Sequence, residues 1–101
     1  MKALKGKNMN NKQLARSLQT VGMRCFVNYF EDFNDLNKTQ DALIKMLIEK
    51  ESYEESGSRA RVNAARRIIR EGRAKDALLL VMVSGIPEET REKAKKLAKI
   101  H

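Results

Sequence analysis

The stretch that most clearly determines the fold of this chain is SRARVNAARRIIREG, residues 58–72. When residues 59–71 are placed on a helix at about 100° per residue, four aliphatic side chains share one arc. They are Val62, Ala65, Ile68 and Ile69. Ser58 is a suitable N-cap and Gly72 a suitable stop, so the stretch predicts one amphipathic helix.

The opposite arc of this predicted helix is basic. It carries Arg59, Asn63, Arg66, Arg67 and Arg70. No carboxylate is interleaved among them, whereas a solvated helix face ordinarily mixes charge signs because neighbouring like charges repel. A guanidinium fork can hold a phosphate or the O6/N7 edge of guanine bidentately, and asparagine can pair with adenine. These five residues are therefore the candidate nucleic-acid contacts.

Two helices are predicted upstream of this stretch. Apolar side chains recur at helical spacing over residues 14–33 and predict a long first helix, in which Gly22 is a candidate break. Asn37 and Gln40 have the form of a capping box that opens a second helix. A connecting loop is expected over residues 51–58.

Two more helices are predicted downstream. The run Leu78–Val83 is continuously apolar and fits either a helix or a buried strand. A helix is favoured, because a strand without a partner strand would leave its backbone groups unpaired. Gly85, Ile86 and Pro87 form a stop-and-restart signal before the last helix. The expected fold class is all-α, a small orthogonal bundle of about five helices.

Length and composition indicate a single soluble domain. The chain has 101 residues, which suffices for one core. We expect a flexible basic N-terminal arm over residues 1–9 and one helical domain over residues 10–101. Cys25 is the only cysteine, which excludes an intrachain disulfide and a cysteine zinc site and favours a cytoplasmic location. No apolar run approaches the ~20 residues that span a bilayer, so no membrane contact is expected.

Charge is segmented along the chain. The formal net charge is +8; residues 1–30 carry six basic and no acidic groups, residues 31–55 carry three and eight, and residues 56–101 carry twelve and five. A basic balance of this size favours anionic partners, above all nucleic acid. The acidic middle segment offers an alternative, in which the arginines of residues 59–70 pair with carboxylates of the same molecule.

The order of elements in residues 37–72 is similar to a helix-turn-helix DNA-binding unit. A helix from about Lys38 to Lys50 is followed by a loop and then by the basic helix. The loop departs from that unit, because it is longer than the typical three or four residues and contains Glu51, Glu54 and Glu55, which repel phosphates. The resemblance implies a DNA-binding module, such as a small transcriptional or mobile-element regulator, which can act as a dimer on two half-sites.

Residues for covalent chemistry are not evident in the sequence. His101, the sole histidine, is the terminal residue, so we expect no histidine-based catalytic arrangement to be held in place. We expect no enzyme activity and no cofactor or metal. The competing expectation is a non-catalytic protein-interaction or assembly module, with an adaptable surface formed by Met23, Met46, Met82 and the apolar fourth helix.

Overall fold

The computed structural model describes residues 9–101, and this part of the chain is folded into seven α-helices without a strand. The helices are α1 (Asn11–Val21), α2 (Met23–Asn28), α3 (Phe30–Asn34), α4 (Gln40–Glu51), α5 (Glu55–Arg70), α6 (Ala74–Met82) and α7 (Glu88–Ile100). The predicted all-α class is confirmed. The apolar run that begins at Leu78 lies in α6, so the helical alternative was the right one.

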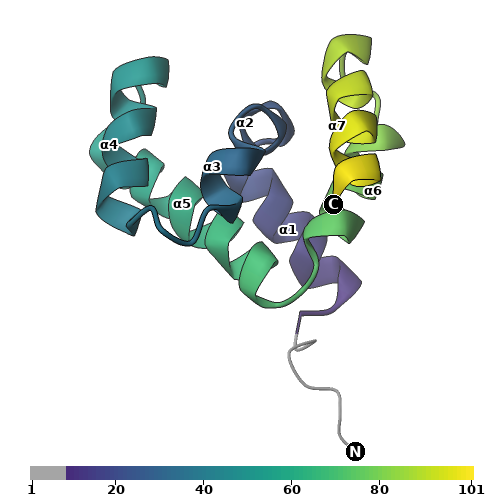
Figure 1. The fold of residues 1–101 in the computed structure, drawn as a ribbon, viewed down its shortest axis with the longest axis horizontal. Coiled ribbons are helices and arrows are strands. Elements are labelled where there is room, and N and C mark those ends of the chain that lie inside the picture. The colour runs from purple at the N-terminus through teal and green to yellow at the C-terminus, as the bar shows by residue number, and fades with distance from the viewer. Residues whose placement is uncertain (1–8) are drawn as a thin grey trace, which may run out of the picture.

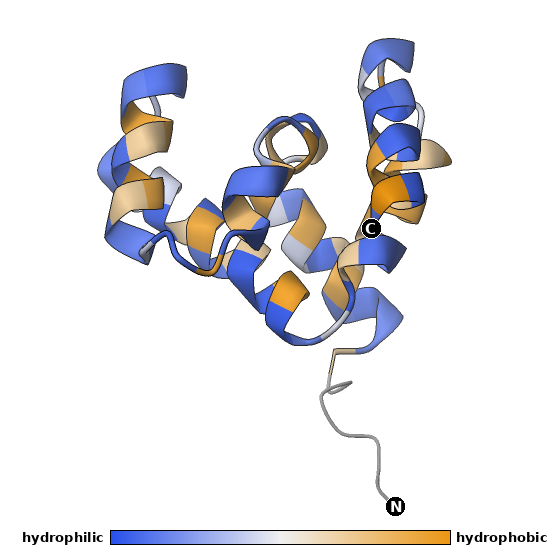
Figure 2. Cartoon of the chain, viewed as in Figure 1, coloured by the Kyte–Doolittle hydropathy of each residue, from blue (hydrophilic) through white to orange (hydrophobic). Residues whose placement is uncertain are grey.

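The seven helices surround one core. Helices α1 and α5 pack against each other at the base of the molecule, α4 stands on one side, α6 and α7 on the other, and α2 and α3 lie between them (Figure 1). The longer helices carry both orange and blue residues, as amphipathic helices around a shared core should (Figure 2). The three phenylalanines are almost fully buried, and Phe26 meets Phe30 edge-to-face with ring centroids 5.4 Å apart.

The predicted long first helix is divided into three, which accounts for the difference between about five expected helices and seven observed ones. Gly22 has φ +88° and separates α1 from α2. Tyr29 has φ −114° and ψ 22°, and it separates α2 from α3. Helix α1 starts with a capping box that the sequence pattern did not predict, in which the side chain of Asn10 accepts from the backbone N–H of Gln13.

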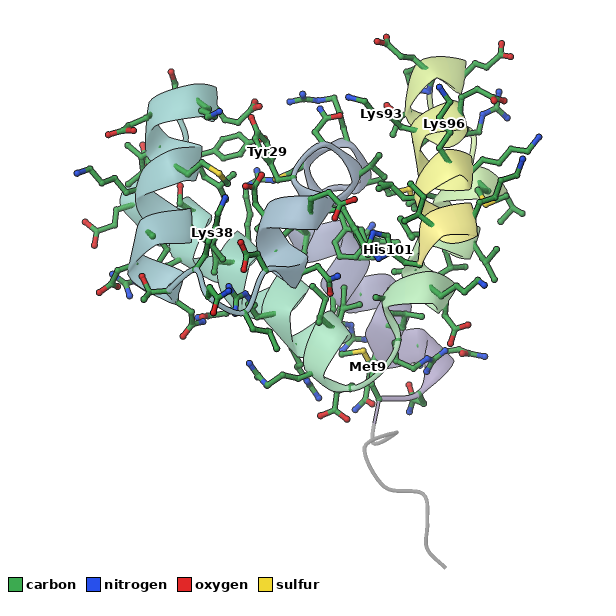
Figure 3. All side chains as sticks on the ribbon, in the orientation of Figure 1. Met9, Tyr29, Lys38, Lys93, Lys96 and His101 are labelled. Atoms are coloured by element: carbon green, nitrogen blue, oxygen red, sulfur yellow. The ribbon has the colours of Figure 1, made fainter. Side chains whose placement is uncertain are left out.

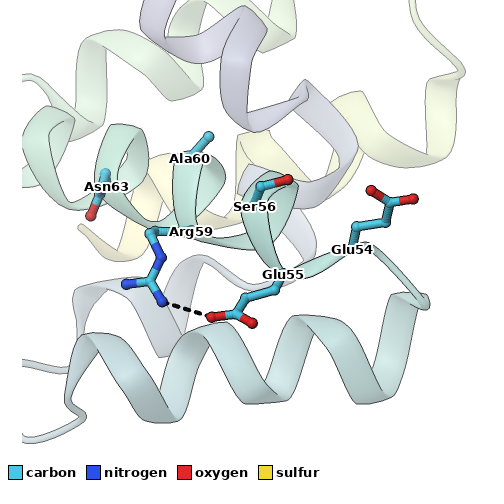
Figure 4. A pocket seen from close by; sticks show the side chains of 6 residues that line it. All are labelled: Glu54, Glu55, Ser56, Arg59, Ala60 and Asn63. Atoms are coloured by element: carbon cyan, nitrogen blue, oxygen red, sulfur yellow. Dashed lines mark hydrogen bonds and ion pairs between the residues drawn. The ribbon is translucent and has the colours of Figure 1, made fainter.

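Helices α4 and α5 begin at other residues than predicted. Thr39, and not Asn37, caps α4 by accepting from the backbone N–H of Ala42. Helix α5 begins at Glu55, so Ser58 is a fully buried residue inside it and not its N-cap. The loop between α4 and α5 therefore contains only residues 52–54, and not the predicted residues 51–58. The two helices lie side by side and run in opposite directions (Figure 4). The helix-turn-helix character predicted for this segment is not confirmed.

Both ends of the described chain are attached to the core. The His101 ring lies 5.0 Å from the Phe30 ring, and its Nε2 is 3.1 Å from Oε2 of Glu31 (Figure 3). The sequence did not predict these contacts of the terminal residue. At the other end Met9 is buried and its carbonyl accepts from Arg73. The rest of the predicted N-terminal arm, residues 1–8, lies outside the described residues.

No helix of residues 9–101 has the length and apolar character that crossing a membrane requires.

Gly22 gives a test of the division between α1 and α2. An alanine Cβ at this position would stand 3.1 Å from Nη1 of Arg61, on a backbone with positive φ. We expect Gly22→Ala to lower the free energy of unfolding by about 1–3 kcal/mol. Gly57, inside α5, is the matched control, because a Cβ there would have no neighbour within 4 Å, and Gly57→Ala should raise stability by about 0.5–1 kcal/mol. Urea denaturation measures both, and equal effects would contradict the account.

Candidate nucleic-acid interface

Helix α5 has the two faces that the sequence predicts. Val62, Ala65 and Ile68 are fully buried, and Ile69 packs against the same core. The five predicted contact residues lie on the other side, where four are exposed and Arg66 is half-buried. Within residues 9–101, three of the five side chains have a hydrogen-bond or ion-pair partner and two have none.

Arg66 has a structural role. Its Nη2 donates to the carbonyl oxygens of Asp35, at 3.0 Å, and Lys38, at 2.6 Å. These carbonyls belong to the segment between α3 and α4, where backbone acceptors are not used by a helix. Arg66 therefore fastens this segment to α5, and a base or phosphate contact would have to displace it.

Asn63 and Arg59 have weaker internal partners. The Asn63 side-chain oxygen accepts from Nε2 of Gln40 at 2.6 Å, and Nη2 of Arg59 lies 2.9 Å from Oε2 of Glu55 (Figure 4). The Arg59–Glu55 pair is a solvent-exposed i,i+4 pair within α5, a type worth about 0.3–0.5 kcal/mol. Anionic ligands can compete for Arg59 at low cost.

Arg67 and Arg70 remain without a partner among residues 9–101. Both are exposed, and they lie one turn apart near the C-terminal end of α5. No hydrogen bond or ion pair within the described chain involves either guanidinium group. Of the predicted set, these two present the full donor capacity of arginine to solvent.

Three carboxylates of the acidic middle segment are bound away from this face, namely Glu31, Asp32 and Glu51. Glu51 accepts from the Tyr29 hydroxyl at 2.5 Å and from Nη2 of Arg24 at 3.1 Å. Figure 3 shows Tyr29 between α4 and the α2–α3 region. The Tyr29 hydrogen bond and then the Arg24 hydrogen bond lower the pKa of Glu51, and the same carboxylate raises the pKa of Tyr29 to about 12. Glu55 alone reaches a predicted contact residue by an ion pair.

One further arginine of α5 is also structural. Nη1 of Arg61 donates to the carbonyl of Val21 at 2.6 Å, at the end of α1, and its guanidinium lies 3.9 Å from the centre of the Tyr53 ring. The nearby Cys25 is buried, and desolvation raises the pKa of its thiol. Arg61 therefore links α1 to the short connection before α5.

Two cations on the neighbouring helix α1 were not assigned to the site. Lys12 and Arg16 are exposed and have no hydrogen bond or ion pair through their side chains within residues 9–101. The sequence pattern predicted contact residues on α5 only, and neither of these two cations was among them. The absence of acidic residues from positions 1–30 was the signal that could have joined them to α5.

Helix α7 shows what an ordinary solvated face of this protein looks like. On its exposed side opposite charges are neighbours: Glu89 and Lys93 at i,i+4 spacing, and Glu92 with Lys95 at i,i+3 and with Lys96 at i,i+4. Figure 3 likewise places Lys93 and Lys96 on this helix. Helix α5, by contrast, has no acidic residue between Glu55 and its C-cap Glu71.

Within residues 9–101, no group of three or more histidine, cysteine or acidic side chains is arranged to hold a metal ion. No protein-family model, no curated protein and no solved structure matches this chain.

Arg66 and Arg67 give a matched test of the division between structural and unpartnered arginines. We expect Arg66→Ala to lower the free energy of unfolding by about 1–3 kcal/mol, because two backbone carbonyls lose a charged donor. Arg67→Ala should change it by less than about 0.5 kcal/mol, as for surface substitutions. Thermal and urea unfolding measure both variants, and a larger loss for Arg67→Ala would show that the assignment is wrong.

Proposed function

We propose that this protein is a nucleic-acid-binding module, with DNA as the expected ligand, and that α5 contacts the phosphate backbone. The observation that carries the proposal is the pair Arg67 and Arg70, two exposed guanidinium groups without a partner among residues 9–101, on a helix that has no acidic residue between Glu55 and its C-cap Glu71. Arginine in this setting is the residue type best suited to phosphate.

The net charge supports the same ligand class. A formal charge of +8 on 101 residues attracts polyanions over the Debye length, and binding then gains free energy from counterion release. Arg59 adds a third cation once its exposed pair with Glu55 opens. A role as a small transcriptional or mobile-element regulator is compatible with such binding.

The proposal does not need helix-turn-helix docking. In that unit the first residues of the second helix contact base edges. Here the first turn of α5 contains Glu55, and Asn63 and Arg66 already bind groups of the α3–α4 region. Phosphate contacts from the C-terminal half of α5 are therefore favoured over base reading by its first half.

A non-catalytic protein-interaction module that associates with itself or with another protein is the second candidate. The three methionines expected to form its surface are partly buried against the core. The observation that favours it is instead on α6, where Leu79 is 44% and Val83 80% exposed beside a hollow shared with Leu14 and Ala15 of α1. Association through such a surface survives high salt, whereas phosphate binding does not.

The double variant Arg67→Ala/Arg70→Ala tests the proposed function. We expect the wild-type chain to bind a labelled DNA duplex at low salt, and the variant to bind about tenfold more weakly, because two phosphate contacts are lost. Fluorescence anisotropy between 50 and 200 mM salt measures this. Lys95→Ala/Lys99→Ala on α7 is the control with the same change in charge. Salt-insensitive binding, or equal losses in both variants, would contradict the proposal.

A further inference from the structure

We propose that the anion-binding surface extends across two helices, and that Lys12 and Arg16 of α1 join Arg67 and Arg70 of α5 to hold both phosphate strands of a duplex without reading its bases. We call these four residues the two-helix basic face. This inference rests on the proposed function and adds its ligand class, a double-stranded nucleic acid, and two binding residues on a second helix.

The register of the two helices places the four cations level with one another. Arg61 of α5 donates to Val21 at the end of α1, and Arg73, just after α5, donates to Asn11 at the start of α1. The helices are therefore antiparallel. Arg16 lies midway between the two anchored residues of α1, and Arg67 lies midway between the two anchoring arginines.

The same register also places Lys12 of α1 level with Arg70 of α5. Lys12 lies one turn from Arg16 towards the start of α1, and Arg70 lies about one turn from Arg67 towards the end of α5. Because the helices run in opposite directions, both steps lead towards the same end of the helix pair. The four cations thus form two rows, one on each helix.

Both rows lie on the outside of the molecule. Helix α1 buries Leu14, Leu18 and Val21, and α5 buries Val62, Ala65 and Ile68, all in the same core. The two helices also pack against each other, at the base of the molecule in Figure 1. Their exposed arcs therefore lie on the outer side of one two-helix layer, away from α2, α3 and α7.

Carboxylates near this layer are already bound. Asp76 pairs with Arg73 at 2.7 Å, and Glu55 pairs with Arg59. Glu71, the half-buried residue that ends α5, is itself engaged. Residues 11–21 contribute no acidic group at all. An anion approaching the layer therefore meets four cations that form no ion pair within residues 9–101.

The two rows suit the two phosphate strands of a duplex better than a single strand. Packed helix axes are about 8–10 Å apart, a distance between the ~6 Å and ~12 Å widths of the two grooves of B-DNA. Within a row the cations are separated by about 4.5–6 Å along the axis. Two rows at this separation can contact the phosphate strands on either side of one groove, whereas a single strand can occupy only one row.

The test compares the two rows one at a time. Lys12→Ala/Arg16→Ala and Arg67→Ala/Arg70→Ala are assayed by fluorescence anisotropy against two 20-base-pair duplexes of unrelated sequence and against one of their single strands, with Lys95→Ala/Lys99→Ala as control. We expect each row variant to weaken duplex binding about tenfold for both sequences and to reduce the slope of log K against log salt by about 1.8. All four side chains are exposed, so we expect each variant to fold like the wild-type chain. Circular dichroism checks this.

The outcomes separate this inference from the proposed function. Loss in the α5 variant with none in the α1 variant would overturn the two-helix basic face and leave the proposed function standing. Tighter binding of the single strand, or a strong preference for one duplex sequence, would also overturn the inference. Failure of the wild-type chain to bind any of the three probes at low salt would overturn both.

Discussion

The position of α5 depends on two of its arginines, which donate hydrogen bonds to backbone carbonyls of neighbouring segments. Arg61 donates to the last residue of α1, and Arg66 donates to two carbonyls before α4, so one helix satisfies backbone acceptors of the segments on both of its sides. Val62, Ala65 and Ile68 of its aliphatic stripe are then fully buried in the core, where α5 packs against α1, α3 and α4. Packing supplies the free energy of this arrangement, and the two guanidinium groups determine how the neighbouring segments are placed against it.

This anchoring also determines which charges are left for a ligand. Residues at i and i+1 on a helix point in directions about 100° apart, so Arg66 can lie against the α3–α4 segment while Arg67 is exposed. Glu51 is held by Tyr29 and Arg24 at the far end of α4, where it binds none of the predicted contact residues. The basic surface therefore results from placement as much as from composition. An equal number of arginines paired with the acidic segment would give the same net charge and no such surface.

The helical class, the buried face of α5 and the position of its stop followed from periodicity and from Gly72, which has φ +72° as a helix-ending glycine should. The residues at which helices begin could be predicted less well from the sequence. Ser58 has the chemistry of an N-cap, but burial of its position in the core overrides that preference, and Glu54 precedes the helix instead. The contact residues could be predicted as one face, because a helical wheel gives direction. A helical wheel could not show that Asn63 bonds to Gln40, or that Arg66 bonds to the carbonyls of residues 35 and 38, since those contacts depend on tertiary packing.

The central claim, that α5 holds structural and ligand-binding arginines side by side, is tested most directly by NMR of the arginine side chains. The account predicts that in the protein alone the Nη–H resonances of Arg61 and Arg66, whose Nη atoms donate to backbone carbonyls, exchange slowly with solvent, while those of Arg67 and Arg70 exchange fast. On titration with a DNA duplex, the resonances of Arg67 and Arg70 should shift and become protected, and those of Arg61 and Arg66 should stay in place. Shifts confined to Arg61 and Arg66, with Arg67 and Arg70 unchanged, would contradict the account.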